Sequence, residues 1–259
     1  MRVIADTHVH IYPCYNVKQA LDNLRMNLFA LDPEATCMAF LAERSDCHFF
    51  ADLRRGGEQI FNDQVKIECF DDAVLIQEEN FPDLYVFPGR QIITREKIEI
   101  LALTIDKEIP DGLAANDVLE KVRGLGGVPV VSWAPGKWFF QRNRVVEKLL
   151  HTNEAGSFLV GDTTLRPIGW LQPLLMRDAK QRGFTIVAGS DPLPFIGEER
   201  IVGQYATRVE VDFDAVTPAV SMRSLMSRPV TNVTLLGRRG NPVATLLRLV
   251  KNAQSKKRA

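Results

Sequence analysis

The sequence predicts an α/β protein with the architecture of a distorted TIM-like (β/α)7 barrel, and three observations predict it. Short apolar runs alternate with longer segments whose apolar residues recur at helical spacing. Nearly every apolar run ends in a conspicuous polar residue, as expected where the carboxyl ends of parallel strands meet at one mouth. The length of 259 residues also fits one barrel of about 200–250 residues.

The elements follow from periodicity and from turn residues, taken in chain order. Asn16 is a suitable N-cap for the first helix, and Gly126-Gly127 ends the second. Residues 65–93 look different, because Asp71-Asp72 and Asn80-Phe81-Pro82 separate short strands and predict a small β-hairpin or meander insertion. The expected strands are 3–5, 38–41, 65–70, 73–77, 84–87, 98–105, 128–133, 158–160 and 184–188, and the expected helices are 17–31, 116–123, 144–151, 168–182, 217–227 and 242–250.

Composition bounds the class of protein. Hydrophobic residues make up 46% and charged residues 25%, which excludes a disordered chain. The formal net charge is zero, so we expect no nucleic-acid partner. No apolar run is long enough to span a bilayer, which predicts no membrane partner. The four cysteines show no CxxC spacing, and the start of the chain turns polar at once, which together favour a cytoplasmic protein.

The chain shows no internal repeat and no linker rich in proline, glycine or serine. Residues 1–250 are therefore expected to form a single domain. Residues 251–259, which read KNAQSKKRA, are expected to be a basic disordered tail. The oligomeric state is left open by the sequence.

His8 and His10 are the sharpest chemical signal. Alternate residues of a strand face the same side, so both imidazoles can face one metal ion, for which Zn, Mn or Fe is suitable. Asp6 is a candidate acceptor that orients one ring. Asp191 ends a later strand and can be a third ligand or a catalytic base. The alternatives are strand-end histidines that bond to the backbone and an aspartate that caps a turn.

Basic residues also gather at the predicted strand ends. Arginine matches phosphate or carboxylate with a planar fork, and lysine adds a point charge. A shared mouth would make these residues an anion site with Trp133 as a wall, whereas the alternative is that each is a paired surface charge. Glu99 and Asp162 are candidates for a general acid or base. The candidate substrate-binding residues are Arg44, Arg90, Lys137, Arg166 and Trp133.

Several of these motifs resemble those of the PHP (polymerase and histidinol phosphatase) superfamily. VIADTHVH at the start resembles the first motif of that family, IEILAL at 98–103 resembles its HILAL-type strand, and GSDPL at 189–193 resembles its GSDAH. The resemblance spans roughly residues 3–193. It implies a distorted seven-stranded TIM-like barrel and metal-dependent phosphoesterase activity.

The resemblance implies metal ligands at His8, His10 and Asp191, with Glu43 in place of a family aspartate. Other ligand positions differ, because Arg44 and Glu99 replace histidines and Arg90 replaces a glutamate. Guanidinium groups at two such positions repel dications, so we reject a trinuclear centre. One divalent metal, or none, remains.

The leading hypothesis is therefore a metal-dependent hydrolase of a small anionic substrate, with a phosphoesterase favoured. The alternative from another class is a catalytically degenerate PHP-like barrel that binds an anionic metabolite or a protein partner without metal. A third hypothesis, a metal-dependent amide or lactone hydrolase, shares the spacing of His8 and His10 but requires further histidines from later strands, which the sequence lacks.

Overall fold

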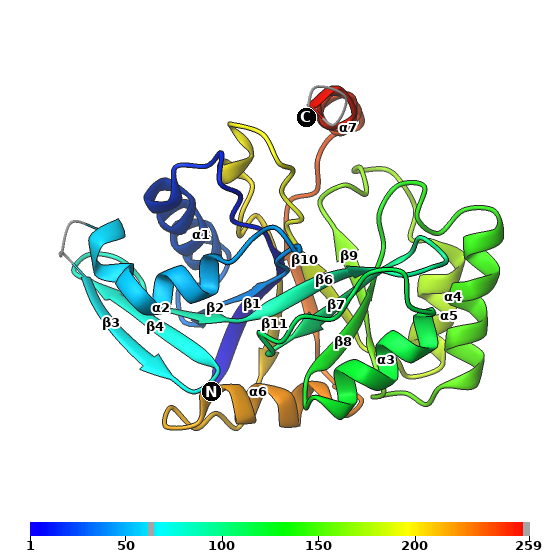
Figure 1. Ribbon diagram of the computed structural model, residues 1–259, viewed down its shortest axis with the longest axis horizontal. Helices are drawn as coiled ribbons and strands as arrows, with labels where there is room; N and C mark the ends of the chain where they lie inside the picture. Colours follow the sequence, from blue (N-terminus) through cyan, green and yellow to red (C-terminus); the bar gives the residue numbers. More distant parts are fainter. Residues whose placement is uncertain (62–64, 256–259) are drawn as a thin grey trace.

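The computed structural model describes residues 1–61 and 65–255, in which the strands form two mixed sheets (Figure 1). The seven-stranded sheet has the order β12 (Thr234–Gly237), β11 (Tyr205–Glu210), β1 (Arg2–Val9), β2 (Thr36–Leu41), β5 (Leu84–Phe87), β4 (Ala73–Glu78) and β3 (Val65–Phe70). The five-stranded sheet has the order β10 (Ile186–Gly189), β9 (Leu159–Thr163), β8 (Val128–Ser132), β7 (Glu99–Leu103) and β6 (Gly89–Ile93).

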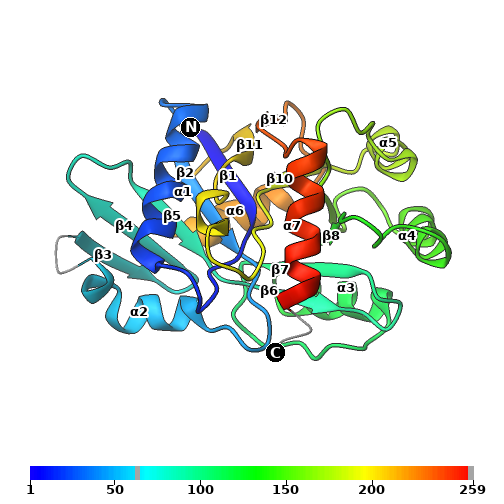
Figure 2. The same ribbon diagram turned by 90° about the horizontal axis from the view of Figure 1, so that it is seen from above.

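Helices cover the outer faces of both sheets. Figure 1 places α1 and α2 beside the first sheet, α3 to α5 beside the second, α6 at one end of the molecule and α7 at the other. Seen from above, α7 crosses the centre of the molecule (Figure 2). The α-helices of the described residues are α1 (Val17–Leu31), α2 (Phe49–Ile60), α3 (Ala115–Gly124), α4 (Gln141–Thr152), α5 (Leu174–Gln181), α6 (Pro218–Met226) and α7 (Pro242–Ser255).

The predicted α/β class is confirmed, but the strands do not form one parallel ladder. Parallel pairing joins β1 to β2, β2 to β5, β8 to β9 and β9 to β10. The pairs β1–β11, β6–β7 and β7–β8 are antiparallel. The reason is general: an apolar run predicts a buried strand and carries no information on its direction.

Local hydrogen bonds join the two sheets at both edges. Beside β1, the amide of Asp191 donates to the carbonyl of His8 at 2.9 Å. Beside β2, the amide of Glu43 donates to the carbonyl of Gly89 at 2.9 Å. Only Pro88 separates β5 from β6, so a single run of chain passes from one sheet to the other. Proline has no N–H to donate, which suits a point where one ladder stops and another starts.

The β-meander expected near residues 65–93 is present as the antiparallel strands β3, β4 and β5. The helix expected over 168–182 is shorter, because α5 begins only after Pro173, which serves as its N-cap residue. The helix expected over 242–250 continues to Ser255 and so includes the start of the predicted tail. Residues 256–259 of that tail lie outside the described residues.

Apolar packing fills the space between the layers and leaves one end polar. One cluster lies between the first sheet and α1 and α2, and a second lies between the other sheet and α3 to α5. A third includes Val3, Phe40, Leu101 and Val187 and fills the space between the two sheets. The polar residues that follow β1 and β10 lie beyond this packing, at the carboxyl ends of the strands. Among the described residues, no helix combines the length and the hydropathy needed to cross a bilayer.

Candidate metal centre

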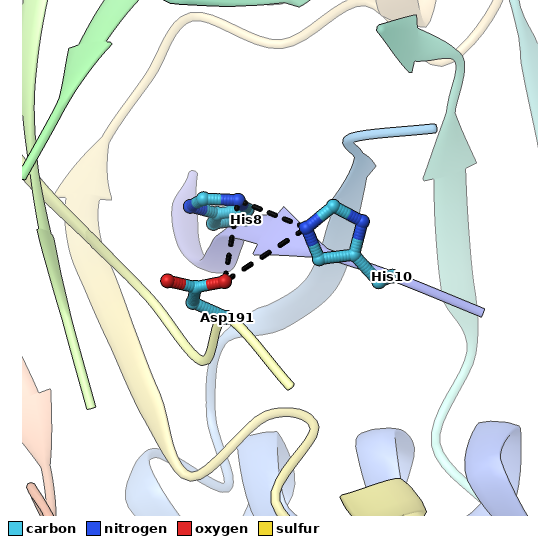
Figure 3. A group of neighbouring side chains, drawn as sticks. All are labelled: His8, His10 and Asp191. Carbon is cyan, nitrogen blue, oxygen red and sulfur yellow. Dashed lines mark hydrogen bonds and ion pairs between the residues drawn. The ribbon is translucent and has the colours of Figure 1, made fainter. Parts of the chain in front are cut away.

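Two imidazoles and one carboxylate converge where β1 and β10 end (Figure 3). His8 Nε2 lies 3.1 Å from His10 Nε2. The Oδ1 atom of Asp191 lies 3.6 Å from His8 Nε2 and 3.8 Å from His10 Nε2. Ligand atoms about 2.1 Å from one tetrahedral ion lie roughly 3.4 Å apart. The spacing of this group therefore fits a single metal ion.

The three residues are buried, with 2%, 3% and 7% of their surfaces exposed in chain order. Burial lowers the pKa of His8 to about 4. Burial, together with the neighbouring His8 ring and the positive charge of Arg44, holds the pKa of His10 well below its usual value. Both imidazoles are therefore neutral at pH 7, which is the form that binds a metal.

Burial raises the pKa of Asp191 to about 7, although the charge of Arg248 opposes this. A buried carboxylate that faces neutral imidazole nitrogens has little to compensate its charge. A divalent cation would supply that compensation, so this donor set fits a metal such as Zn²⁺, Mn²⁺ or Fe²⁺. In a metal site, the ring nitrogen that faces away is held by another group, and Ser132 Oγ lies 3.3 Å from His8 Nδ1.

Asp6 organises the backbone around this group. Its Oδ1 accepts from the amides of His8 at 3.1 Å and Ser190 at 2.9 Å, and its Oδ2 accepts from the amide of Gly203 at 2.9 Å. The sequence-based expectation that Asp6 orients an imidazole is therefore corrected: it joins β1 to the segment that carries Asp191. Burial raises the pKa of this carboxyl, and the hydrogen bonds that it accepts from Ser190, Gly203 and His8 oppose that shift.

Close approach of the two chain segments requires a glycine at position 189. A Cβ atom there would lie 2.4 Å from His8 Cβ and 2.5 Å from His8 N, which no side chain tolerates. Two residues later, Asp191 has φ of +48°, the left-handed region that a non-glycine residue adopts only when its surroundings impose it. In the GSD motif, Gly189 thus allows the close packing against His8, and the backbone of Asp191 directs its carboxylate toward the imidazoles.

A cavity of about 190 Å³ opens beside His10 and Asp191. Three of the residues that the sequence singled out line it: Arg44, Glu99 and Lys137. Lys137 Nζ lies 2.9 Å from Glu99 Oε1, and Arg44 Nη2 donates to Asp46 at 2.9 Å. The cavity therefore has both positive and negative side chains beside His8, His10 and Asp191, which we call the metal group.

Other cavity residues were not predicted from the sequence. Tyr12 stacks on His10 with ring centroids 5.0 Å apart, and Leu249 and Asn252 of α7 complete the wall. Tyr12 lies two residues beyond His10, so the same alternation that paired the histidines could have pointed to it. The α7 residues could not be found in this way, because nothing in the sequence indicates where a C-terminal helix packs.

Glu43 and Arg90 lie together at the other seam between the sheets. Glu43 Oε1 accepts from the amide of Phe50 at 3.0 Å, and its Oε2 lies 3.8 Å from Arg90 Nη1. Arg90 also donates to the carbonyl of Cys47 at 3.0 Å and to Asp106 Oδ1 at 2.6 Å. Burial raises the pKa of Glu43 to about 7. Neither residue lines the cavity or belongs to the group of His8, His10 and Asp191.

Asp162 and Arg166 are occupied with each other. Arg166 Nε donates to Asp162 Oδ1 at 2.8 Å, a second guanidinium nitrogen donates to Oδ2, and Tyr205 Oη donates to Oδ2 at 2.9 Å. We call these three residues the Asp162 cluster. Trp133 is fully buried in the core of the second sheet and lies edge-on to Trp170 at 6.2 Å, so it does not line the cavity.

Comparisons with known proteins show similarity in structure. No family model matches the chain, and no curated protein matches its sequence. The crystal structure of PsfC from Pseudomonas syringae PB-5123 aligns with a TM-score of 0.59 at 14% identity, over 98% of this chain and 98% of PsfC. The lesion-specific endonuclease PfuEndoQ from Pyrococcus furiosus aligns with a TM-score of 0.49 at 11% identity, over 91% of this chain and 58% of the enzyme.

A complex of Endonuclease Q with a 27-mer duplex that carries an abasic lesion at the active site aligns with a TM-score of 0.47 at 11% identity, over 90% of this chain and 58% of that one. The chain thus spans little more than half the length of Endonuclease Q. The expectation that nucleic acid is not a partner, and that only a small anion is, is therefore wrong, since the neighbours include an enzyme that binds DNA. Net charge is a sum over the whole chain, and it does not prevent cations such as Arg44 and Lys137 from gathering at one mouth.

At identities this low, similarity shows the fold and not the activity. The alignment with PsfC, over nearly the whole of both chains, shows a shared fold. The chain combines a mixed α/β fold with a buried histidine–histidine–aspartate group that could bind a metal.

Proposed function

We propose that the chain is a metal-dependent hydrolase of an anionic substrate, and specifically a phosphoesterase that uses one divalent metal. A single observation carries the proposal: His8, His10 and Asp191 aim three acceptor atoms at one point beside a cavity lined by cations. Phosphate esters combine the negative charge that Arg44 and Lys137 favour with a phosphoryl oxygen that suits a metal.

His8, His10 and Asp191 would hold the ion. Bound there, the ion supplies Lewis-acid chemistry for phosphoryl transfer. Arg44 and Lys137, which both line the cavity, would bind the substrate anion and stabilise charge that develops on its oxygens. Glu99 lines the cavity and forms an ion pair with Lys137 at 2.9 Å. Its carboxylate would accept or donate the proton during hydrolysis.

Arg90, Arg166 and Asp162 are not included in this mechanism, because none of them lines the cavity. Their polar atoms also bond to neighbouring protein groups. Glu43 is not included as a ligand, because its carboxylate does not belong to the group of close ligand atoms that His8, His10 and Asp191 form. A supporting role for Trp133 is limited to packing behind β8.

The test is metal-dependent hydrolysis by the full-length chain. Metal-free protein would be supplied with Zn²⁺, Mn²⁺ or Fe²⁺ and assayed on a phosphate monoester, a phosphate diester and an oligonucleotide duplex. We expect turnover that requires metal and is lost in His8→Ala. His151→Ala is the matched control, because this imidazole is half exposed on α4 and its contacts are with Asp178 and Arg182. Absence of metal binding would overturn the proposal.

One observation favours a second candidate, an anion-binding protein without metal. The charge of Arg44 reaches His10 and lowers its pKa, and the same charge repels a cation bound there. Thermal unfolding with inorganic phosphate separates the two candidates. Stabilisation by phosphate that is unchanged after chelation of all metal would favour the binder, whereas stabilisation that requires Zn²⁺ or Mn²⁺ would favour the enzyme.

A further inference from the structure

The C-terminal helix α7 packs over the cavity with its polar side. Thr245, Arg248, Leu249 and Asn252 are spaced along one face of the helix, and the last two line the cavity. Thr245 is 2% exposed. The opposite face is apolar and faces solvent, with 61% of Leu246 and 64% of Leu247 exposed. Since the hydrophobic effect acts on apolar area removed from water, it contributes little to holding this helix in place.

Polar contacts of Arg248 hold the helix instead. Its Nε donates to Glu198 Oε1 at 2.9 Å and its Nη2 to Glu198 Oε2 at 2.7 Å. Its Nη1 donates to Thr164 Oγ1 at 3.0 Å, and its Nη2 also reaches the carbonyl of Asp191 at 3.3 Å. Arginine offers five donors in a rigid fork, and here one guanidinium uses that fork on three different segments.

Those segments include the backbone that presents Asp191. Glu198 Oε2 accepts from the amide of Leu193 at 2.9 Å, and Thr164 Oγ1 donates to the carbonyl of Ser190 at 2.5 Å. Contacts made by Arg248 therefore surround a residue whose φ of +48° is unfavourable without support. Loss of the guanidinium would leave the strained turn with fewer restraints.

We propose that Arg248 is a positioning residue, which latches α7 over the cavity and holds the Asp191 backbone in the conformation that points its carboxylate at the two imidazoles. The proposal rests on the metal site proposed above. The helix α7 would then contribute to the site, although it follows Asp191 by about 50 residues in the sequence. Docking of the helix and binding of the metal are then coupled through one side chain.

The test uses Arg248→Ala, Arg248→Lys and a matched control, Arg238→Ala, which removes an exposed arginine just before α7. Amide hydrogen exchange over residues 242–255 is measured on the metal-free protein, and Co²⁺ affinity is measured by absorbance titration. We expect Arg248→Ala to raise exchange in α7 and to weaken Co²⁺ binding by about tenfold, as loss of an outer support of a metal ligand does. Arg248→Lys should give a smaller change in both, and Arg238→Ala no change.

Glu198→Gln weakens the same contact from the other side and should also raise exchange in α7. Unchanged exchange in Arg248→Ala would overturn the latch, and raised exchange with unchanged Co²⁺ affinity would overturn the positioning of Asp191. A parent chain that binds no Co²⁺ would mean that the proposed function has failed, whereas the exchange result would still decide whether Arg248 latches the helix.

Discussion

Two buried polar clusters follow neighbouring strands of this fold, and they differ in whether their groups satisfy one another. In the Asp162 cluster, the carboxylate oxygens accept from Arg166 and Tyr205, so donors and acceptors match. At the metal group, His8 Nε2, His10 Nε2 and Asp191 Oδ1 face each other as potential acceptors. An aspartate at a strand end therefore does not indicate a ligand site by itself. The convergence of two imidazole nitrogens on a carboxylate that forms no ion pair with a lysine or arginine of the described residues does, because an external cation would compensate that charge.

Removal of His10 should have the largest effect. In His10→Ala we expect Co²⁺ affinity to fall by about a thousandfold, or ~4 kcal/mol, because one of three ligands is lost. Absorbance titration of the metal-free protein measures it. If His10→Ala bound Co²⁺ as tightly as the parent chain, the acceptors that face each other would not be ligands, and the contrast with the Asp162 cluster would disappear.

Asp162→Ala should act on stability and not on metal. Arg166 would be left buried without its carboxylate, which costs about 3 kcal/mol in the free energy of unfolding. Urea denaturation of the metal-free protein measures the loss, and Co²⁺ titration of the folded variant provides the control. If Asp162→Ala kept the stability of the parent but bound Co²⁺ more weakly, Asp162 would belong to the metal site and not to a structural cluster.

Asp191→Asn should change how stability depends on pH. The folded pKa of about 7 is above the ordinary value of 3.8, so the carboxyl contributes stability that is fully present below about pH 4 and lost as pH rises through 7. Without metal, the asparagine variant should be more stable than the parent by up to about 4 kcal/mol at pH 8 and nearly equal to it at pH 4. Urea denaturation across this range measures the difference.

His8 acts in the opposite sense, because its folded pKa of about 4 lies below the ordinary 6.5 and its contribution is lost as pH falls through 4. This contribution is common to the parent and to Asp191→Asn, so the difference between them isolates Asp191. Parallel stability curves for the two proteins would show that the carboxyl is not destabilised by burial.

Tyr205→Phe should have the smallest effect. It removes one hydrogen bond to a carboxylate that keeps its arginine partner, so we expect a loss of about 1 kcal/mol in the free energy of unfolding. Thermal unfolding with and without Co²⁺ measures it, and the shift caused by Co²⁺ should match that of the parent. A larger loss together with weaker Co²⁺ binding would link the two clusters.

The metal group could be predicted from the sequence because its information is local. Alternate residues of a strand share a side, so His8 and His10 identify one face, and Asp191 follows a run that is plainly a buried strand. The remaining site residues depend on packing. Arg248 reaches Asp191 only because α7 crosses the mouth, which no spacing in the sequence encodes.

One expectation could have been sharper. Asp162 and Arg166 are four residues apart within GDTTLRP, which is close enough to suggest that they pair with each other. The direction of each strand could not be inferred, since buried parallel and antiparallel strands have the same apolar composition. The helix α2 was missed because Gly56 and Gly57 interrupt its pattern, and non-helical backbone at Gly56 marks the same interruption.

The passage of β5 into β6 through Pro88 has a consequence for how the molecule can be divided. A cut at this proline would leave each half with a sheet edge that had lost its continuation, and with half of the apolar filling between the layers exposed to water. We therefore expect that neither fragment folds alone, and that denaturation of the intact chain proceeds as one cooperative transition with both halves melting together.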